Sequence, residues 1–176
     1  MNTSHISKSL LAGALALAVF ATPVFAGGKS IKEGDTFPDL SKFNLEGTLP
    51  AELKGKVVLV DFWASWCGPC KESFPVMEDL QQRYSSQGLV ILAVNLDDEE
   101  SAMKEFLKDH KASFTIVRDA SKKLVGTVNI ASMPSSFIVG PDGKVAVVHK
   151  GFHGKDTARE YAQEIEGLLN KTVASK

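Results

Sequence analysis

Apolar and polar positions follow one another along the chain in blocks that predict strands and helices in turn. Val57–Phe62 and Leu89–Leu96 are almost continuously apolar, which is the pattern of strands covered on both faces of a sheet. Pro75 lies inside the helix expected between them and should kink it. That helix has one predicted buried stripe: Phe74, Met77, Leu80 and Tyr84. The strand–helix–strand order favours parallel pairing of the two strands.

The second half of the chain continues this alternation. We expect a helix over Ser101–His110, a short strand over Phe114–Val117 and a turn or short helix over Leu124–Ile130. Ser136–Val139 and Val145–His149 are joined by the sequence Gly-Pro-Asp-Gly, which predicts a hairpin. Parallel strands therefore come first in the chain, and an antiparallel pair comes last.

The two ends of this pattern complete the predicted fold. Thr157–Asn170 carries an apolar stripe and predicts a last helix, whereas Leu40–Leu45 indicates a short edge strand that extends the sheet. These elements predict an α/β fold in which helices flank a mixed central sheet. We expect a single domain over residues 27–176.

Length and charge narrow the class of protein. The 176 residues suit one domain with a sizeable core, and the 44% hydrophobic content is ordinary for a globular protein. The formal net charge is -1, and no cluster of Lys and Arg forms a track for phosphate groups. We therefore expect no nucleic-acid partner.

Residues 1–26 have the pattern of an export signal peptide. A polar start that contains Lys8 precedes an apolar run over Leu10–Phe20, and Val24–Ala26 forms a small-x-small cleavage site. The apolar run is shorter than the roughly 20 residues of a spanning helix, so we expect no stable membrane insertion after cleavage. An uncleaved N-terminal anchor is the alternative. Export implies an oxidising compartment, which we expect to be the periplasm.

Cys67 and Cys70 are the only cysteines in the chain. A structural disulfide across Gly68 and Pro69 would constrain the unfolded chain little. Their place at the start of a predicted helix favours a redox pair instead, because a helix N-terminus stabilises a thiolate. We expect Cys67 to attack a substrate disulfide and Cys70 to resolve the mixed disulfide. Gly68 permits a tight entry to the helix, and Pro69 suits its first turn.

Asp61 is the candidate proton acceptor for Cys70. It lies six residues before Cys67 on the strand predicted to be buried, where loss of water should raise the pKa of its carboxyl group. It could take the Cys70 proton through water. The structural alternatives are an acid that caps a loop and an acid that pairs with a buried cation.

The candidate substrate-binding residues are Trp66, Gly68, Pro69, Met133 and Pro134. A cis proline beside the cysteines would leave the Met133 backbone free to pair with an extended substrate peptide. Trp66, next to Cys67, would form an apolar lip of that groove. An ordinary turn proline is the alternative reading of Pro134.

The remaining polar residues do not favour metal chemistry. Cys-x-x-Cys is half of a zinc site, but the chain has no second cysteine pair, and its four histidines are scattered. We expect the acidic run Asp97–Glu100 to be a solvated helix start and not a cation site. We therefore expect no metal and no bound cofactor apart from the redox-active disulfide Cys67–Cys70.

The sequence V-D-F-W-A followed by W-C-G-P-C resembles the thioredoxin superfamily, and Met133-Pro134 matches its cis-proline position. The export signal, the lead-in G-D-T-F-P-D-L and the unit over Glu99–Val117 are similar to the exported TlpA/ResA-type branch. The resemblance covers the mature chain. It implies a thioredoxin-like fold with an N-terminal strand extension and an inserted helix–strand unit.

The chain departs from that branch at two positions. Many TlpA/ResA-type proteins carry an acid three residues after the second cysteine, where this chain has Ser73, so that role is not transferred to the neighbouring Glu72. The branch often has Asn at the position of Asp61, which is thioredoxin-like here. Thioredoxins tend to carry a Lys near this Asp, and the matching position is Ala93, so Asp61 should be harder to ionise.

The resemblance implies a periplasmic thiol–disulfide oxidoreductase that works mainly as a reductant. The Gly-Pro spacer between the cysteines resembles that of thioredoxin, whose reduction potential is about -270 mV. It is less similar to the spacers of strong oxidants, whose potentials are about -120 mV. It also implies a membrane thiol donor of the DsbD type. Implied substrates are disulfide-containing proteins, such as those with the haem-site cysteines of apocytochrome c or with copper-site cysteines. The alternatives are a disulfide oxidant or isomerase and a copper(I)-binding chaperone that uses both thiolates.

Overall fold

The computed structural model describes Met1 and residues 29–174 of the chain. The predicted signal peptide and its cleavage site therefore lie outside the described residues, apart from Met1. Within the described part, no helix has the length and apolar character needed to cross a membrane.

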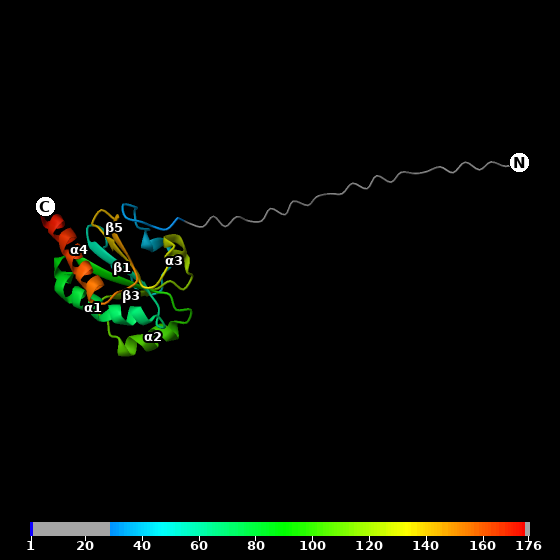
Figure 1. Ribbon diagram of the computed structural model, residues 1–176, viewed down its shortest axis with the longest axis horizontal. Coiled ribbons are helices and arrows are strands. Elements are labelled where there is room, and N and C mark those ends of the chain that lie inside the picture. Colours follow the sequence, from blue (N-terminus) through cyan, green and yellow to red (C-terminus); the bar gives the residue numbers. More distant parts are fainter. Residues whose placement is uncertain (2–28, 175–176) are drawn as a thin grey trace.

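A five-stranded mixed sheet forms the centre of the fold, in the order β3-β2-β1-β4-β5 (Figure 1). β1, β2 and β3 are mutually parallel, and β4 and β5 form the antiparallel pair, with β4 antiparallel to β1. Every residue of the central strand β1 is buried, which explains its continuous apolar run. The strands are β1 (Val57–Trp63), β2 (Leu89–Asn95), β3 (Thr115–Arg118), β4 (Ser135–Val139) and β5 (Val145–Lys150).

Helices cover both faces of this sheet (Figure 1). Because side chains alternate along a strand, Leu59 and Trp63 of β1 pack in the core cluster with α1, α2 and α4. Val60 and Phe62 point to the opposite face, where α3 and the N-terminal segment pack. The helices are α1 (Gly68–Tyr84), α2 (Glu100–Asp109), α3 (Lys123–Val128) and α4 (Lys155–Ala174). The predicted α/β fold and the inserted helix–strand unit are confirmed.

Two predicted elements differ from those observed. The predicted edge strand over Leu40–Leu45 is wrong, because Leu40–Lys42 form a short 3-10 helix. The Asp39 carboxylate accepts a hydrogen bond from the Ser41 N–H at 3.1 Å and so caps this helix. The last helix, α4, continues beyond the predicted end and reaches Ala174. The N-terminal segment instead forms two isolated bridges: Thr36 with Lys144, and Glu46 with Arg118.

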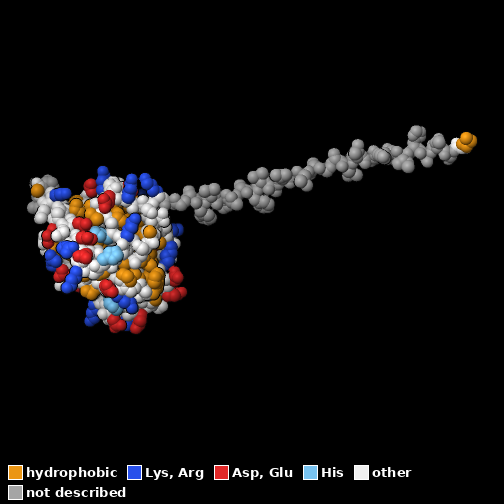
Figure 2. All heavy atoms as spheres, in the orientation of Figure 1, with side chains coloured by type: hydrophobic (Ala, Val, Ile, Leu, Met, Phe, Trp, Pro, Cys, Tyr) orange, Lys and Arg blue, Asp and Glu red, His pale blue; other side chains and the backbone are white. Residues whose placement is uncertain are grey.

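The molecular surface carries charges of both signs. Figure 2 shows Lys and Arg side chains interspersed with Asp and Glu side chains over the face drawn. This mixture is consistent with the formal net charge of -1.

Candidate active site

The connection from β1 to α1 presents the cysteine pair at the start of a helix. Cys67 is the N-cap residue of α1, with φ -82° and ψ 108°, and its Sγ accepts a hydrogen bond from the Cys70 N–H at 3.3 Å. Pro69 occupies the first turn, where the absence of an N–H costs no helical hydrogen bond. Cys67 and Cys70 form a disulfide, with their Cα atoms 5.3 Å apart. The predicted start of this helix near Cys67 or Gly68 is confirmed.

The two sulfur-bearing residues differ in their access to solvent. Cys67 is 5% exposed, whereas Cys70 is fully buried at 0%. Trp66 precedes Cys67 and is 69% exposed, and Gly68 and Pro69 are exposed as well. A partner protein can therefore approach Cys67 from outside, while Cys70 faces the core.

Asp61 lies inside the protein on β1, as its sequence position predicts. Its register partners are Ala93 on β2 and Ser136 on β4, and Ala93 supplies no charge to the carboxylate. Burial raises the pKa of Asp61 from 3.8 to about 7, while the hydrogen bond from Ser136 acts in the opposite direction. Strand alternation places Asp61 on the same face as Trp63, in the layer that contains Cys70.

The Met133–Pro134 peptide bond is cis. Pro134 is buried and directly precedes β4, where Ser135 pairs with Phe62 of β1. Because β1 and β4 are antiparallel, this bond lies at the end of β1 from which the cysteine loop departs. Met133 is partly exposed, and its backbone groups make no hydrogen bond to another backbone group of the described chain.

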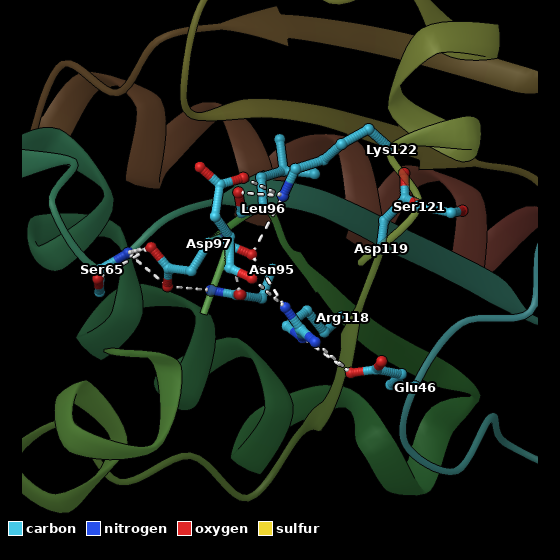
Figure 3. Close-up of polar contacts among 10 residues, drawn as sticks. Glu46, Ser65, Asn95, Leu96, Asp97, Arg118, Asp119, Ser121 and Lys122 are labelled. Carbon is cyan, nitrogen blue, oxygen red and sulfur yellow. Dashed lines mark hydrogen bonds and ion pairs between the residues drawn. The ribbon is translucent and has the colours of Figure 1, made fainter. Parts of the chain in front are cut away.

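A buried carboxylate that sequence reasoning missed holds the loop before the cysteines. Asp97 is only 2% exposed, so its assignment to a solvated helix start is wrong; α2 begins later, with Glu99 as its N-cap residue. Both carboxylate oxygens of Asp97 accept from the Ser65 N–H at 3.1 Å, and one accepts from the Ser65 hydroxyl at 2.9 Å (Figure 3). Asn95 donates to Asp97 at 2.7 Å. Asp97 therefore positions the loop two residues before Cys67.

Two cations hold the backbone that carries Asp97 (Figure 3). Arg118 on β3 donates from Nη1 to the carbonyl oxygens of Asp98, at 2.7 Å, and Asp97, at 3.3 Å. Its Nε donates to Glu46 at 2.8 Å, which ties the N-terminal segment to this region. Lys122 donates to the Asp97 carbonyl oxygen at 3.1 Å. One signal for this arrangement was in the sequence, because Asn95 ends a buried strand and Asp97 comes two residues later.

The residues around Cys70 leave Asp61 as the acid to consider. Ser73, three residues after Cys70, is fully buried and donates to the Cys70 carbonyl oxygen at 2.9 Å. Glu72, to which no catalytic role was transferred, is exposed. Trp63 packs in the core against Phe74. Within the described residues, no group of three or more His, Cys, Asp or Glu side chains is placed to hold a metal ion.

Comparison with known proteins agrees with this site. The Redoxin family matches residues 32–165. The thiol-disulfide oxidoreductase ResA of Bacillus subtilis is 34% identical over 145 residues, which cover 81% of each chain. The ResA of Bacillus cereus is 32% identical over 158 residues, which cover 89% of this chain and 91% of that protein.

Two solved structures share the fold. A Chlorobium tepidum structure that carries the name thiol:disulfide interchange protein DsbE has a TM-score of 0.73 and 36% identity, and the match covers 80% of this chain and 99% of that one. StoA of Bacillus subtilis has a TM-score of 0.55 and 26% identity, over 62% of this chain and 84% of that one.

The mixed sheet and the disulfide at the start of α1 define the thioredoxin superfamily, and the fold and the redox activity predicted from the sequence are confirmed. The chain belongs to the Redoxin family and is a ResA/TlpA-type thiol–disulfide oxidoreductase.

Proposed function

We propose that this chain is exported to the periplasm and works there mainly as a reductant of protein disulfides. The observation that carries the proposal is the Cys67–Cys70 pair at the N-terminus of α1, with Cys67 alone reaching the surface. The Gly-Pro spacer supports the direction, because thioredoxin has the same spacer and a potential of about -270 mV.

The proposed reaction begins with the reduced form of the pair. The Cys67 thiolate attacks one sulfur of a substrate disulfide, the substrate S–S bond breaks, and the other substrate sulfur leaves as a thiolate. Cys70 then gives its proton to Asp61, and the Cys70 thiolate attacks Cys67 Sγ. This step forms the Cys67–Cys70 disulfide and releases the second substrate thiolate. A dithiol donor must return two electrons and two protons for the next cycle.

The substrate peptide would bind beside Trp66 and the Met133–Pro134 bond. The 69% exposed Trp66 side chain offers apolar surface next to Cys67, and the Met133 backbone is available for pairing with an extended peptide. Gly68 and Pro69 are exposed and complete this side of the site. Main-chain pairing gives affinity without requiring one particular substrate sequence.

Electron supply and substrates follow from the proposed compartment. An oxidising compartment does not reduce Cys67–Cys70, so the chain requires a membrane thiol donor, for which we propose the DsbD type. The resemblance to TlpA/ResA-type proteins supports haem-site cysteines of apocytochrome c or cysteines of copper-site proteins as substrates.

The direction is tested by the reduction potential of Cys67–Cys70, measured against a glutathione or dithiothreitol series. We expect a value well below about -180 mV, and a value above it would place the chain with isomerases and oxidants. An insulin-reduction assay on wild type and Cys67→Ser tests turnover. Tight copper(I) binding without turnover by wild type would overturn the redox proposal in favour of metal carriage.

The partner is identified by trapping in cells. Cys70→Ser should leave Cys67 joined to its substrate as a mixed disulfide that mass spectrometry can identify. Cys67→Ser is the matched control, because it retains one thiol but lacks the more accessible one, and it should trap no partner. Equal trapping by the two variants would contradict the assignment of Cys67 as the attacking thiol.

A further inference from the structure

Two hydroxyl groups from distant parts of the sequence form a chain of hydrogen bonds that ends on Asp61. The Ser136 hydroxyl on β4 donates to Asp61 Oδ1 at 2.6 Å, and the Tyr161 hydroxyl on α4 lies 2.6 Å from the Ser136 oxygen. All three residues have 0% exposure. We call these two hydroxyls the Ser136–Tyr161 pair. The pair contacts the carboxylate inside the protein, at one of its two oxygens.

The direction of donation follows from the chemistry of the three groups. An ionised carboxylate can only accept, so Ser136 gives its single hydroxyl proton to Asp61 and Tyr161 donates to Ser136. Burial raises the pKa of Tyr161, and the charge of Asp61 raises it further, so Tyr161 keeps its proton at neutral pH. Two hydroxyl dipoles aligned in this way favour the ionised form of the carboxylate.

The second carboxylate oxygen is in a different position. Asp61 Oδ2 is buried and has no hydrogen-bond partner among the described residues. Leu59 and Trp63 belong to the core cluster that contains Cys70, and strand alternation puts Asp61 between them on the same face. Oδ2 is therefore the carboxylate oxygen that accepts no hydrogen bond from the described residues, and Asp61 lies on the face of the sheet where Cys70 is packed.

We propose that the Ser136–Tyr161 pair is a positioning device that occupies Oδ1, leaves Oδ2 to take the Cys70 proton, and raises the fraction of Asp61 that is ionised. The inference rests on the role proposed above for Asp61. In this step the Cys70 S–H bond breaks, an O–H bond forms on Oδ2, and the Cys70 thiolate displaces the substrate sulfur from Cys67. Ala93, the neighbour of Asp61 on β2, has no charge that could stabilise the carboxylate. In this proposal the two hydroxyl groups of the pair provide that stabilisation.

The other titratable groups near the pair lie beyond Tyr161. The His149 ring on β5 meets the Tyr161 ring edge-on, with centroids 4.8 Å apart. His149 also bonds Glu164 of α4 at 2.7 Å and lies 3.7 Å from Glu160. From α1, the titratable group is Cys70. His149 is therefore followed separately in the experiment below, because its ring contacts Tyr161.

The test is an NMR titration of the Asp61 carboxyl group in the oxidised protein, with the ring signals of His149 recorded in parallel. We expect Ser136→Ala to lower the proton dissociation constant of Asp61 about tenfold, which is a pKa higher by about one unit. Tyr161→Phe should lower it about threefold, because it weakens the donation by Ser136. Tyr161→Phe keeps the ring in the core, so the test remains available if Ser136→Ala folds poorly.

Two matched controls remove a buried hydroxyl without touching Asp61. Ser135→Ala is the neighbouring change on β4, where the Ser135 hydroxyl donates to the Ser132 carbonyl oxygen at 2.7 Å. Tyr84→Phe removes a tyrosine hydroxyl that bonds Glu166 between α1 and α4. Both controls should leave the Asp61 titration where it is in wild type.

A kinetic readout connects the titration to the reaction. Cys67 is loaded with glutathione as a mixed disulfide, and the release of glutathione by Cys70 is followed against pH. In Ser136→Ala the pH at which the release rate rises should be higher than in wild type. The size of this shift should equal the shift of the Asp61 pKa in the NMR titration. The positioning role of the Ser136–Tyr161 pair is overturned if Asp61 titrates as in wild type in both Ser136→Ala and Tyr161→Phe, or if the controls shift it equally. Either result leaves the proposed redox function unaffected. A wild-type pH profile in Asp61→Asn overturns the acceptor role itself, and this inference with it.

Discussion

Two buried aspartates, Asp61 on β1 and Asp97 shortly after β2, differ in the hydrogen bonds that their carboxylates accept. Asp97, 2% exposed, accepts hydrogen bonds from the Ser65 N–H, the Ser65 hydroxyl and Asn95, so both of its oxygens are occupied. Asp61, 0% exposed, accepts one hydrogen bond from Ser136, and its Oδ2 has no partner among the described residues.

This difference separates a structural carboxylate from one suited to proton transfer. A buried carboxylate that accepts from several donors is held in one orientation, as a positioning group requires. A buried carboxylate with one donor keeps a pKa near neutrality, about 7 for Asp61. Burial is common to the two aspartates, and the number of donors at each carboxylate oxygen is what differs between them.

The largest effect is expected from Asp61→Asn. In the folded protein the pKa of Asp61 is about 7, against 3.8 for an ordinary Asp, so the folded state binds the proton more tightly across that interval. Wild type should lose about 4 kcal/mol of its free energy of unfolding as pH rises through the interval, and Asp61→Asn should not. Denaturant unfolding of the oxidised proteins at a series of pH values measures this.

The direction in which the stability difference between Asp61→Asn and wild type changes with pH identifies Asp61 as its source. The stability of Asp61→Asn relative to wild type should grow with pH from about 4 to about 8 and then level off. A difference that stays constant with pH would mean that Asp61 ionises in the folded protein as it does in the unfolded chain.

The next effect in size is expected from Asp97→Ala. Removal of this carboxylate leaves the buried donors of Ser65 and Asn95 without their acceptor, which should cost about 3 kcal/mol in the free energy of unfolding. Redox turnover should fall as well, because the loop that carries Cys67 loses its anchor. Chemical denaturation and insulin reduction measure the two effects.

Asp98→Ala is the matched control for Asp97→Ala. The Asp98 side chain is 93% exposed and forms an ion pair with Lys122 at 3.3 Å. Its removal should change the free energy of unfolding by less than about 0.5 kcal/mol. Similar losses in the two variants would show that Asp97 acts as one more surface acid of this run.

The smallest effect is expected in the outer part of the same network, from Arg118→Met. The Arg118 side chain is 11% exposed, and its loss removes the donors to the carbonyl oxygens of Asp97 and Asp98, for about 2 kcal/mol in the free energy of unfolding. Glu46→Gln is the control, because the Glu46 side chain is 49% exposed and its ion pair should contribute only about 0.5 kcal/mol. Thermal and chemical unfolding compare them. Equal losses would assign the effect to the ion pair and not to the carbonyl contacts.

Local patterns were sufficient for the parts of the fold that depend on neighbours in sequence. The run that became β1 is apolar throughout because both its faces are covered, and Gly68 and Pro69 mark the start of α1 by their backbone properties. The failed edge strand has a local cause as well, since the Asp39 side chain competes for the backbone and caps a turn. The sequence alone was therefore enough for the fold class and for the Cys67–Cys70 pair.

The surroundings of the two aspartates depend on contacts between segments far apart in the chain. Asp97 and its neighbours Asp98 to Glu100 look alike in sequence, and Asp97 is buried because the end of β2 lies beside the end of β1, where Ser65 is found. Ser136 and Tyr161 reach Asp61 from another strand and another helix. The apolar run around Asp61 was enough to predict its burial, but strand pairing and helix packing decide which carboxylate oxygen gains a donor and bury Asp97 apart from its acidic neighbours.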